Sequence, residues 1–270
     1  MKGEFLRRLP GMLDALIVPP GTAAGLEQRD PRHTLGLPGK EDASGKIAML
    51  LEELSELQER LYAEGRRSVL LILQGLDASG KDGTIRRVFT GVNPQGCHIT
   101  SFKAPSPVEL AHDFLWRVHA ETPARGMIGI FNRSHYEDVV TVGVLGLAPE
   151  EVWRRRPQRI VEFERMLTEE GTAVLKCFLH VSVEEQRERF GERLSDPSKR
   201  WKHNPQDEET SRRFGEYTSA YEEALSLTST EWAPWYAIPA DRNWVRNLAV
   251  ATVVVEALRR IDPQLPDSRP

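Results

Sequence analysis

The chain has 270 residues, of which 40% are hydrophobic and 28% are charged, so one large domain can bury a sizeable core. Its formal net charge of -4 and its pI near 6.0 argue against a nucleic-acid-binding protein, because such proteins are usually basic. The two cysteines, Cys97 and Cys177, lie far apart, which argues against a disulfide framework or a CxxC metal site and favours the reducing cytoplasm. No apolar run approaches the roughly 18 residues of a membrane span, so we expect no membrane association.

The elements alternate along the chain between helices and strands. Residues 1–42 are rich in proline and glycine and predict an irregular N-terminal arm. Leucines at spacings of 4, 3 and 4 predict an amphipathic helix over 44–65. Beyond it we expect strands at 68–74, 97–102, 127–131, 173–181 and 235–238, separated by helices at 81–92, 107–120, 150–170, 183–194, 207–227 and 241–260.

This alternation predicts an α/β fold with three layers, α/β/α, because right-handed crossovers place parallel strands in one sheet and cover both faces with helices. We therefore expect a parallel five-stranded sheet. The domain boundaries that follow are an arm over 1–42, a core domain over 43–262 and a Pro-rich tail over 263–270. In such sheets ligands collect at the carboxyl ends of the strands, so the segments that follow the strands are the candidate site.

A glycine-rich segment follows the first predicted strand of the sheet. The spacing Gly75-x4-Gly80-Lys81 is typical of a P-loop, in which backbone N–H groups, a helix N-terminus and a lysine converge on phosphate oxygens. The alternative is a plain strand-to-helix turn with an exposed lysine. Since the strand, the spacing and the helix agree, we expect phosphate contacts from Gly75, Ala78, Ser79, Gly80, Lys81, Asp82, Gly83 and Thr84.

Two carboxylates depart from the usual P-loop pattern. Asp82 stands where a Ser or Thr hydroxyl normally binds Mg²⁺, and Thr84 follows two residues later. Asp77 lies inside the loop, where phosphate oxygens would repel it unless a divalent cation lay between them. The sequence therefore predicts a Mg²⁺ site that includes Asp77. Asp82 also has a second interpretation, because acidic residues in the first turn of a helix are stabilised by the macrodipole.

A second group of charged residues follows the third predicted strand. Asn132 occupies the position at which a Walker B motif has its aspartate, so Glu137 and Asp138 would have to reach the metal from the following turn. The alternative is a solvated helix start. Arg133 is suited to neutralising the charge on a transferring phosphoryl group.

Residues 183–213 combine two charged helices with a Pro-containing connection, the position of the lid in P-loop nucleotide kinases. Arg187 and Arg189 alternate with glutamates and are interpreted as structural. Arg193, Lys199 and Arg200 are the favoured phosphate ligands, although charged helices often only face solvent.

Together these segments make the chain resemble the polyphosphate kinase 2 family over roughly residues 50–260. Members of that family are P-loop kinases with a helical lid, so the resemblance implies that fold here. The segments that carry the resemblance are Gly75-Leu76-Asp77-Ala78-Ser79-Gly80-Lys81-Asp82-Gly83-Thr84, Gly91-Val92-Asn93-Pro94, Phe114-Leu115-Trp116-Arg117, Asn132-Arg133-Ser134-His135-Tyr136-Glu137-Asp138-Val139, Lys199-Arg200-Trp201-Lys202 and Ala233-Pro234-Trp235-Tyr236.

The resemblance implies reversible transfer of the terminal phosphoryl group of inorganic polyphosphate to a nucleotide, with Mg²⁺ or Mn²⁺. The His-Tyr-Glu-Asp form of the second motif is similar to class III members, which phosphorylate both AMP and ADP, the latter giving ATP. The implied catalytic residues are Asp77, Lys81, Arg133 and Asp138, and the implied metal ligands are Asp77, Glu137 and Asp138.

The same resemblance implies a dimer or a tetramer. Two rival functions stay open at this point, an ATP-dependent nucleoside monophosphate kinase and a non-enzymatic sensor of polyanions or nucleotides.

Overall fold

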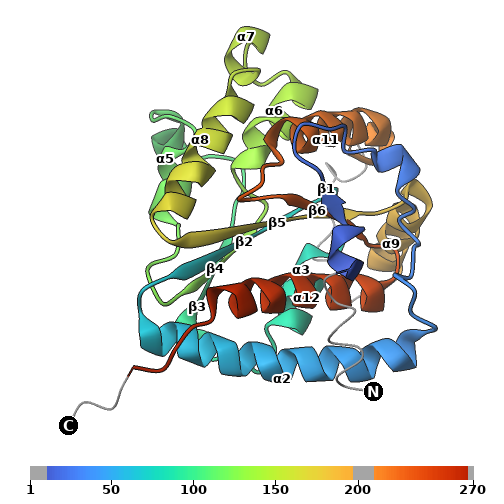
Figure 1. Cartoon of the computed structure of the whole chain (residues 1–270). Helices are drawn as coiled ribbons and strands as arrows, with labels where there is room; N and C mark the ends of the chain where they lie inside the picture. Colours follow the sequence, from blue (N-terminus) through green and yellow to red (C-terminus); the bar gives the residue numbers. More distant parts are fainter. Residues whose placement is uncertain (1–10, 197–209, 267–270) are drawn as a thin grey trace.

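The computed structural model describes residues 11–196 and 210–266. The described residues form a sheet of six strands in the order β1-β6-β5-β2-β4-β3 (Figure 1). Five strands are parallel, and β1 pairs with β6 in the antiparallel direction. The strand bounds are β1 (Ile17–Val18), β2 (Ser68–Gln74), β3 (Cys97–Ser101), β4 (Ile128–Asn132), β5 (Thr172–His180) and β6 (Trp235–Pro239).

Helices connect the parallel strands and cover both faces of the sheet. The α-helices are α2 (Lys40–Glu64), α3 (Lys81–Val88), α4 (Pro107–Leu110), α5 (Trp116–Ala120), α6 (Val140–Leu145), α7 (Glu150–Trp153), α8 (Arg156–Glu169), α9 (Val183–Ser195), α11 (Phe214–Thr228) and α12 (Asn243–Ile261). The described part of the chain also contains three short 3₁₀ helices, η1 (Leu26–Gln28), η2 (Pro94–Gly96) and η3 (His135–Asp138). None of the described helices combines the length and the apolar content that crossing a membrane requires.

The sheet lies between two helical layers, as Figure 1 shows. On one face α12 packs against β5 and β6, with α2 on its outer side and α3 beside it. On the other face α8 packs against β5, and α11 packs against α8 and α6. The residues of β2 from Val69 to Leu73 and those of α12 from Leu248 to Val255 are all buried, and apart from Thr252 they are apolar, as expected of a central strand and of a helix that packs inside the protein. The α/β class and the three layers are therefore confirmed.

The predicted count of five strands needs a correction. The five parallel strands are present, but the arm adds β1 at the outer edge of β6, where the Ala237 N–H also donates to the Leu16 carbonyl at 2.8 Å. Leu13, Leu16 and Val18 are buried in the core, so residues 13–18 are not irregular as expected. A strand of two residues is too short to produce a detectable alternation of apolar and polar residues.

Several helix boundaries also differ from the expectation. The expected helix over 107–120 is two short helices, α4 and α5, separated by a turn, and the expected helix over 150–170 is divided into α7 and α8. Helix α3 ends at Val88 before the positive φ of Gly91. Helix α6 was not predicted, because its six residues span less than two turns of periodicity.

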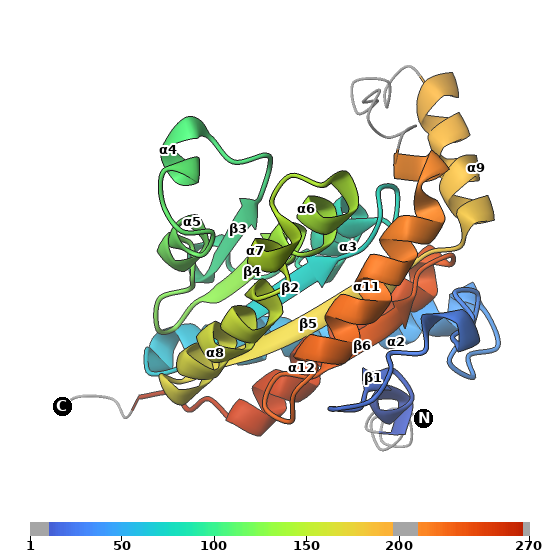
Figure 2. The ribbon, with the colours of Figure 1, turned by 90° about the horizontal axis from the view of Figure 1, so that it is seen from above.

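The carboxyl ends of β2 and β4 lie beside each other at one edge of the sheet. The two strands are paired in parallel, and Arg133 N, just past the end of β4, donates to the Leu73 carbonyl at 3.1 Å. In Figure 2 the helices α3, α6 and α11 lie around this end of β2. The segments 75–81 and 132–139 are therefore brought together by the pairing of their strands.

Candidate active site

The loop between β2 and α3, called the phosphate loop here and comprising residues 75–81, is shaped by two glycines. Gly75 and Gly80 have φ values of 145° and 99°, which residues with side chains rarely adopt. A Cβ at Gly75 would also lie 2.8 Å from the carbonyl oxygen of Leu179, and one at Gly80 would overlap the guanidinium group of Arg246. The turn is therefore compatible only with glycine at both positions.

Ala78 and Ser79 form the turn between these glycines. Ala78 adopts the left-handed region with φ of 64°, a conformation that is unfavourable for a residue with a Cβ and that is often found at functional sites. The Ser79 N–H donates to the Leu76 carbonyl at 3.1 Å, which closes the turn. Both residues are buried.

Lys81 opens α3 and folds back onto the loop. Its buried Nζ donates to the carbonyl oxygens of Gly75 at 2.6 Å and Leu76 at 3.1 Å. Burial, and then the nearby Arg133, lower the pKa of Lys81 to about 8, although Asp77 opposes the shift. An anion bound here would favour the charged form, so the desolvated ammonium group is well suited to a phosphate oxygen.

Arg133 joins the phosphate loop to the second motif. One guanidinium nitrogen pairs with the Asp77 carboxylate, and the other lies 3.3 Å from Oε2 of Glu137. Glu137 most strongly, and Asp77 in addition, raise the pKa of Arg133, although burial opposes the shift. Glu137 is held in place by the Thr141 hydroxyl, which donates to it at 2.6 Å. The structure thus brings together three of the predicted site residues around one guanidinium group.

Asp138 takes part in a different set of ion pairs. Arg156 donates to its backbone carbonyl at 2.7 Å and lies 3.3 Å from its carboxylate, and Arg117 lies 3.7 Å from the other carboxylate oxygen. Burial raises the pKa of Asp138 above its usual value, although both arginines oppose the shift. The expected set of metal ligands, Asp77, Glu137 and Asp138, is therefore not assembled around one point. Among the described residues, no three His, Cys, Asp or Glu side chains are grouped to hold a metal ion by themselves.

The first turn of α3 does not present its side chains as one phosphate-binding surface. Oδ1 of Asp82 accepts a hydrogen bond of 2.8 Å from the Asn132 amide, which links α3 to the end of β4. The Thr84 hydroxyl is buried and accepts a hydrogen bond of 2.7 Å from Nε of Arg246. Gly83 is exposed in the same turn. Of these three predicted contacts, the hydroxyl of Thr84 is already engaged inside the protein.

The lid residues are only partly covered by the structure. The guanidinium group of Arg193 on α9 lies over the ring of Phe190 at 5.3 Å. Lys199 and Arg200 lie outside the described residues. Arg189 pairs with Glu185, one of the glutamates with which it alternates, at 2.8 Å, and it also donates to the Ala78 carbonyl of the phosphate loop at 2.8 Å. No local sequence pattern indicates this second contact.

A buried polar cluster lies behind the second motif and was not predicted. The Lys176 ammonium on β5 lies 2.7 Å from the Glu164 carboxylate on α8, and both side chains are fully buried. Tyr136 donates to Glu164 at 2.8 Å, and His135 lies 3.4 Å from the same carboxylate. Burial alone would raise the pKa of Glu164, but the positive charge of Lys176 holds it below its usual value. The sequence feature that could have revealed this cluster is Lys176, because a lysine is unusual within an otherwise largely apolar strand.

Comparison with known proteins assigns the family. The model of the family described as "Polyphosphate kinase 2 (PPK2)" matches residues 39–266, which is most of the chain. The chain belongs to the polyphosphate kinase 2 family. The resemblance expected from the motifs is therefore confirmed.

Relatives and solved structures of the polyphosphate kinase 2 family agree with this assignment. The chain is 52% identical over 242 residues to an AMP/ADP-polyphosphate phosphotransferase of Meiothermus ruber, covering 89% of this chain and 91% of the relative. It is 45% identical to an ADP-polyphosphate phosphotransferase of Rhodopseudomonas palustris, covering 82% and 80%. A crystal structure of polyphosphate kinase 2 from Arthrobacter aurescens is similar with a TM-score of 0.91 and 40% identity, covering 95% of this chain and 92% of that one.

The residues of this polyphosphate kinase 2 site fit a divalent cation whose shell is completed by substrate. Mg²⁺ is usually bound through one or two carboxylates together with phosphate oxygens and water. Asp77 and Glu137 provide two carboxylates that contact the same guanidinium group, beside the loop that would hold a phosphate. Chelation by three protein carboxylates is not needed for such a site.

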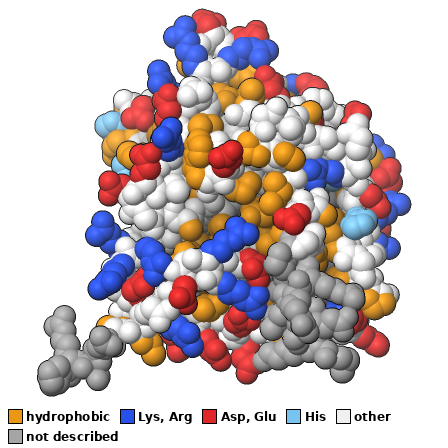
Figure 3. Space-filling view, in the orientation of Figure 1, with side chains coloured by type: hydrophobic (Ala, Val, Ile, Leu, Met, Phe, Trp, Pro, Cys, Tyr) orange, Lys and Arg blue, Asp and Glu red, His pale blue; other side chains and the backbone are white. Residues whose placement is uncertain are grey.

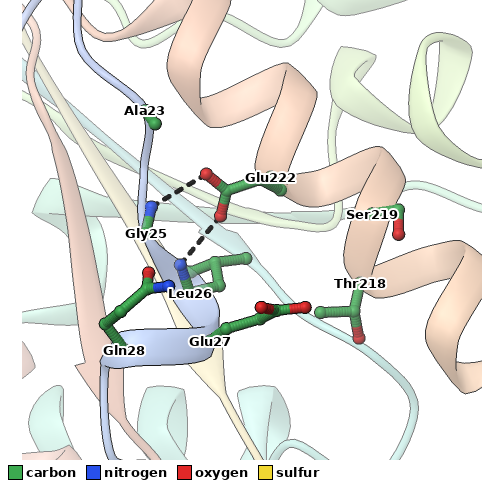
Figure 4. Close-up of a pocket in the computed structure, with 8 residues that line it drawn as sticks. All are labelled: Ala23, Gly25, Leu26, Glu27, Gln28, Thr218, Ser219 and Glu222. Carbon is green, nitrogen blue, oxygen red and sulfur yellow. Dashed lines mark hydrogen bonds between the residues drawn. The ribbon is translucent and has the colours of Figure 1, made fainter.

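A separate polar pocket of about 310 Å³ lies between the arm and α11 (Figure 4). The Glu222 carboxylate accepts hydrogen bonds of 2.8 Å from the N–H groups of Gly25 and Leu26, and Glu27 adds a second acid. The pocket contains no residue of the phosphate loop or of segment 132–139. Two carboxylates without a basic residue make it unsuited to a phosphate.

Proposed function

We propose that this polyphosphate kinase 2 protein transfers the terminal phosphoryl group of inorganic polyphosphate to AMP and to ADP, reversibly and with a divalent cation. The observation that carries the proposal is the convergence of the phosphate loop, Lys81 and Arg133 at the carboxyl ends of β2 and β4. The identity of 52% to an AMP/ADP-polyphosphate phosphotransferase supports the choice of donor and acceptors.

The chain's own residues have separable tasks in this reaction. The loop N–H groups and Lys81 would bind donor phosphate oxygens, and Arg133 would neutralise charge on the group being transferred. Asp77 and Glu137 would hold the divalent cation, which supplies further neutralisation of phosphate charge when it is bound. We propose Mg²⁺ or Mn²⁺ for this position.

Little proton transfer is needed. The attacking oxygen belongs to an AMP or ADP phosphate that is already ionised at neutral pH, so positioning and charge neutralisation dominate. Asp138 then acts chiefly by holding Arg117 and Arg156, with which it is paired. In the proposed mechanism these two arginines would contact the acceptor nucleotide. Arg193, Lys199 and Arg200 are proposed to contact the distal polyphosphate chain.

The function is tested by following phosphoryl transfer with phosphorus NMR. AMP or ADP is incubated with polyphosphate and Mg²⁺, and in parallel AMP is incubated with ATP but without polyphosphate. We expect ADP and ATP to form with polyphosphate, and the reaction to stop when divalent cations are chelated. Turnover with ATP as the only effective phosphoryl donor for AMP would instead indicate a nucleoside monophosphate kinase. Binding of substrates without turnover would indicate a sensor.

A dimer or tetramer and a cytoplasmic location also remain proposals. On the face in Figure 3, basic and acidic side chains are intermingled around an area with more hydrophobic ones. Val108, Leu110 and Trp116 are exposed apolar side chains on α4 and α5. Light scattering after size-exclusion chromatography should give twice or four times the chain mass of 30.6 kDa. A mass equal to one chain would contradict the proposed assembly.

A further inference from the structure

The carbonyl groups of the phosphate loop are held by side chains at five consecutive positions. Lys81 accounts for the first two, at Gly75 and Leu76. The next three are contacted by side chains from outside the loop: Gln186 to Asp77 at 3.0 Å, Arg189 to Ala78 at 2.8 Å and Arg246 to Ser79 at 3.1 Å.

These contacts determine where the loop N–H groups point. Across a trans peptide plane the C=O of one residue and the N–H of the next point in opposite directions. Holding the carbonyls of Asp77 and Ser79 therefore directs the N–H groups of Ala78 and Gly80 away from Gln186 and Arg246. These are the groups that a P-loop offers to phosphate oxygens.

The donors on α9 and α12 are themselves fixed. Gln186 is fully buried, and Arg246 is 3% exposed. Arg246 also donates to the Thr84 hydroxyl at 2.7 Å and to Oδ1 of Asn243 at 2.8 Å. Its guanidinium group occupies the space that a side chain at Gly80 would need. A rigid donor of this kind can hold the backbone in one orientation.

Arg189 connects the same loop to the end of β6. One guanidinium nitrogen donates to the Ala78 carbonyl, and the other lies 2.8 Å from the carbonyls of both Ala240 and Asp241. The start of α9 is held at the same place, because Ser182 N and Oγ donate to the Asp241 carboxylate at 2.8 and 2.7 Å. The first helix of the lid region is thus bonded directly to the phosphate loop.

We propose that Gln186, Arg189 and Arg246 are positioning residues for the donor polyphosphate. They act through the backbone of the phosphate loop, whose carbonyls they turn outward so that its N–H groups face the donor. This role is distinct from that of the lid cations, which would contact the polyphosphate chain itself. The inference rests on the proposed function and deepens it, because it specifies how the donor subsite is kept in shape.

The test uses substitutions that leave the net charge of the protein unchanged. Arg189→Lys and Arg246→Lys keep the positive charge but lose the forked donor geometry, and Gln186→Met keeps the side-chain size but loses the amide donor. Arg187→Lys is the matched control, because Arg187 is exposed on the same helix. For each folded variant, kcat and both KM values are measured with polyphosphate and AMP.

We expect the KM for polyphosphate to rise about tenfold in the three test variants, the scale of losing one hydrogen bond that involves a charged or buried group. The KM for AMP should stay within about twofold of the parent value, and Arg187→Lys should resemble the parent. An unchanged KM for polyphosphate in the folded variants would overturn the proposal. So would an equal rise in both KM values, because it would indicate a general disturbance of the site, or a fall in kcat alone, because it would show an effect on the transition state and none on donor binding.

A direct measurement of binding tests this inference independently of the proposed function, because it does not require turnover. Calorimetric titration with inorganic tripolyphosphate and Mg²⁺ should give an affinity about tenfold weaker in Arg189→Lys than in the parent and in Arg187→Lys. This result would support the positioning role even if the parent did not turn over polyphosphate. Parent-like affinity in all three test variants would refute it while leaving the activity intact. If Arg246→Lys fails to fold, Arg189→Lys and Gln186→Met carry the test.

Discussion

The two segments that meet at the site are stabilised in different ways. The phosphate loop is compact: its glycines, the buried Lys81 and the turn at Ala78 lie within seven residues. Segment 132–139 depends instead on distant parts of the chain, because Arg133 pairs with Asp77 and the ring of Tyr136 packs beside the buried pair Glu164 and Lys176. The turn of the loop is therefore shaped largely by its own residues, although Gln186, Arg189 and Arg246 hold three of its carbonyls, whereas the other segment depends mainly on tertiary contacts.

Because the two segments are stabilised differently, substitutions in them should affect different properties of the protein. Changes within the loop should mainly affect substrate binding and turnover, since its residues are proposed to bind the donor phosphates. Changes behind segment 132–139 should first affect folding, since that support is a charged pair in the core. The predictions below test this division.

The largest effect is expected from the buried pair. Glu164→Leu should lower the free energy of unfolding by about 3–5 kcal/mol, because it leaves the Lys176 ammonium buried without its counter-charge. Urea denaturation monitored by fluorescence measures this change. The double variant Glu164→Leu/Lys176→Met should recover at least half of the loss. Equal stability of the parent and the Glu164→Leu variant would show that the pair does not support the second motif.

Substitutions in the loop should reduce turnover and leave stability nearly unchanged. Lys81→Ala and Asp77→Asn should each lower kcat by at least about 10²-fold, the scale of removing one preorganised charge from a transition state. Asp138→Asn is expected to have a similar effect through Arg117 and Arg156. Steady-state assays with polyphosphate and ADP measure kcat, and circular dichroism checks the fold. A folded variant with kcat near that of the parent would remove that residue from the catalytic group.

The pKa of Lys81 predicts a loss of donor binding at alkaline pH. With a pKa of about 8, Lys81 is charged below pH 8 and neutral above it, so kcat/KM for polyphosphate should fall by about tenfold per pH unit above pH 8. The kcat should fall less, because bound phosphate favours the charged lysine. Lys81→Arg, whose guanidinium group stays charged, should abolish the alkaline decline even if its rate is lower. An identical decline in that variant would assign the titration to another group.

The smallest expected effect concerns the backbone of the loop. Ala78→Gly should raise the free energy of unfolding by less than about 1 kcal/mol, because glycine adopts the left-handed region without strain but gains entropy in the unfolded state. The same substitution at Ala48, exposed within α2, should lower it by about 0.5–1 kcal/mol. Thermal denaturation of the parent and of both variants measures the two changes in the free energy of unfolding. Loss of stability at both positions would mean that Ala78 is not strained.

Much of the fold was predictable because its signals are local. Apolar runs bounded by glycine and proline predicted the five parallel strands, and the spacing Gly75-x4-Gly80-Lys81 predicted the phosphate loop. Strand β1 was missed because two residues carry no periodicity.

The part of the site that could not be predicted from the sequence depends on contacts between residues that are far apart in the chain. Gln186, Arg189 and Arg246 lie more than 100 residues beyond the carbonyls that they contact. Sequence spacing could show only the helical pair of Arg189 with Glu185. It also could not show that Asp138 turns toward two arginines. These side-chain contacts are determined by how the helices pack against the sheet, and local sequence patterns do not reveal them.

The short strand β1 has a practical consequence for anyone who shortens this protein. The family match begins at residue 39, yet residues 16–18 pair with strand β6, and Leu13, Leu16 and Val18 are buried in the core. A chain cut to the matched range would present the edge of β6 with unpaired backbone groups beside an apolar gap. Unprotected edges of this kind join to one another, so such a fragment would be prone to aggregate through its sheets.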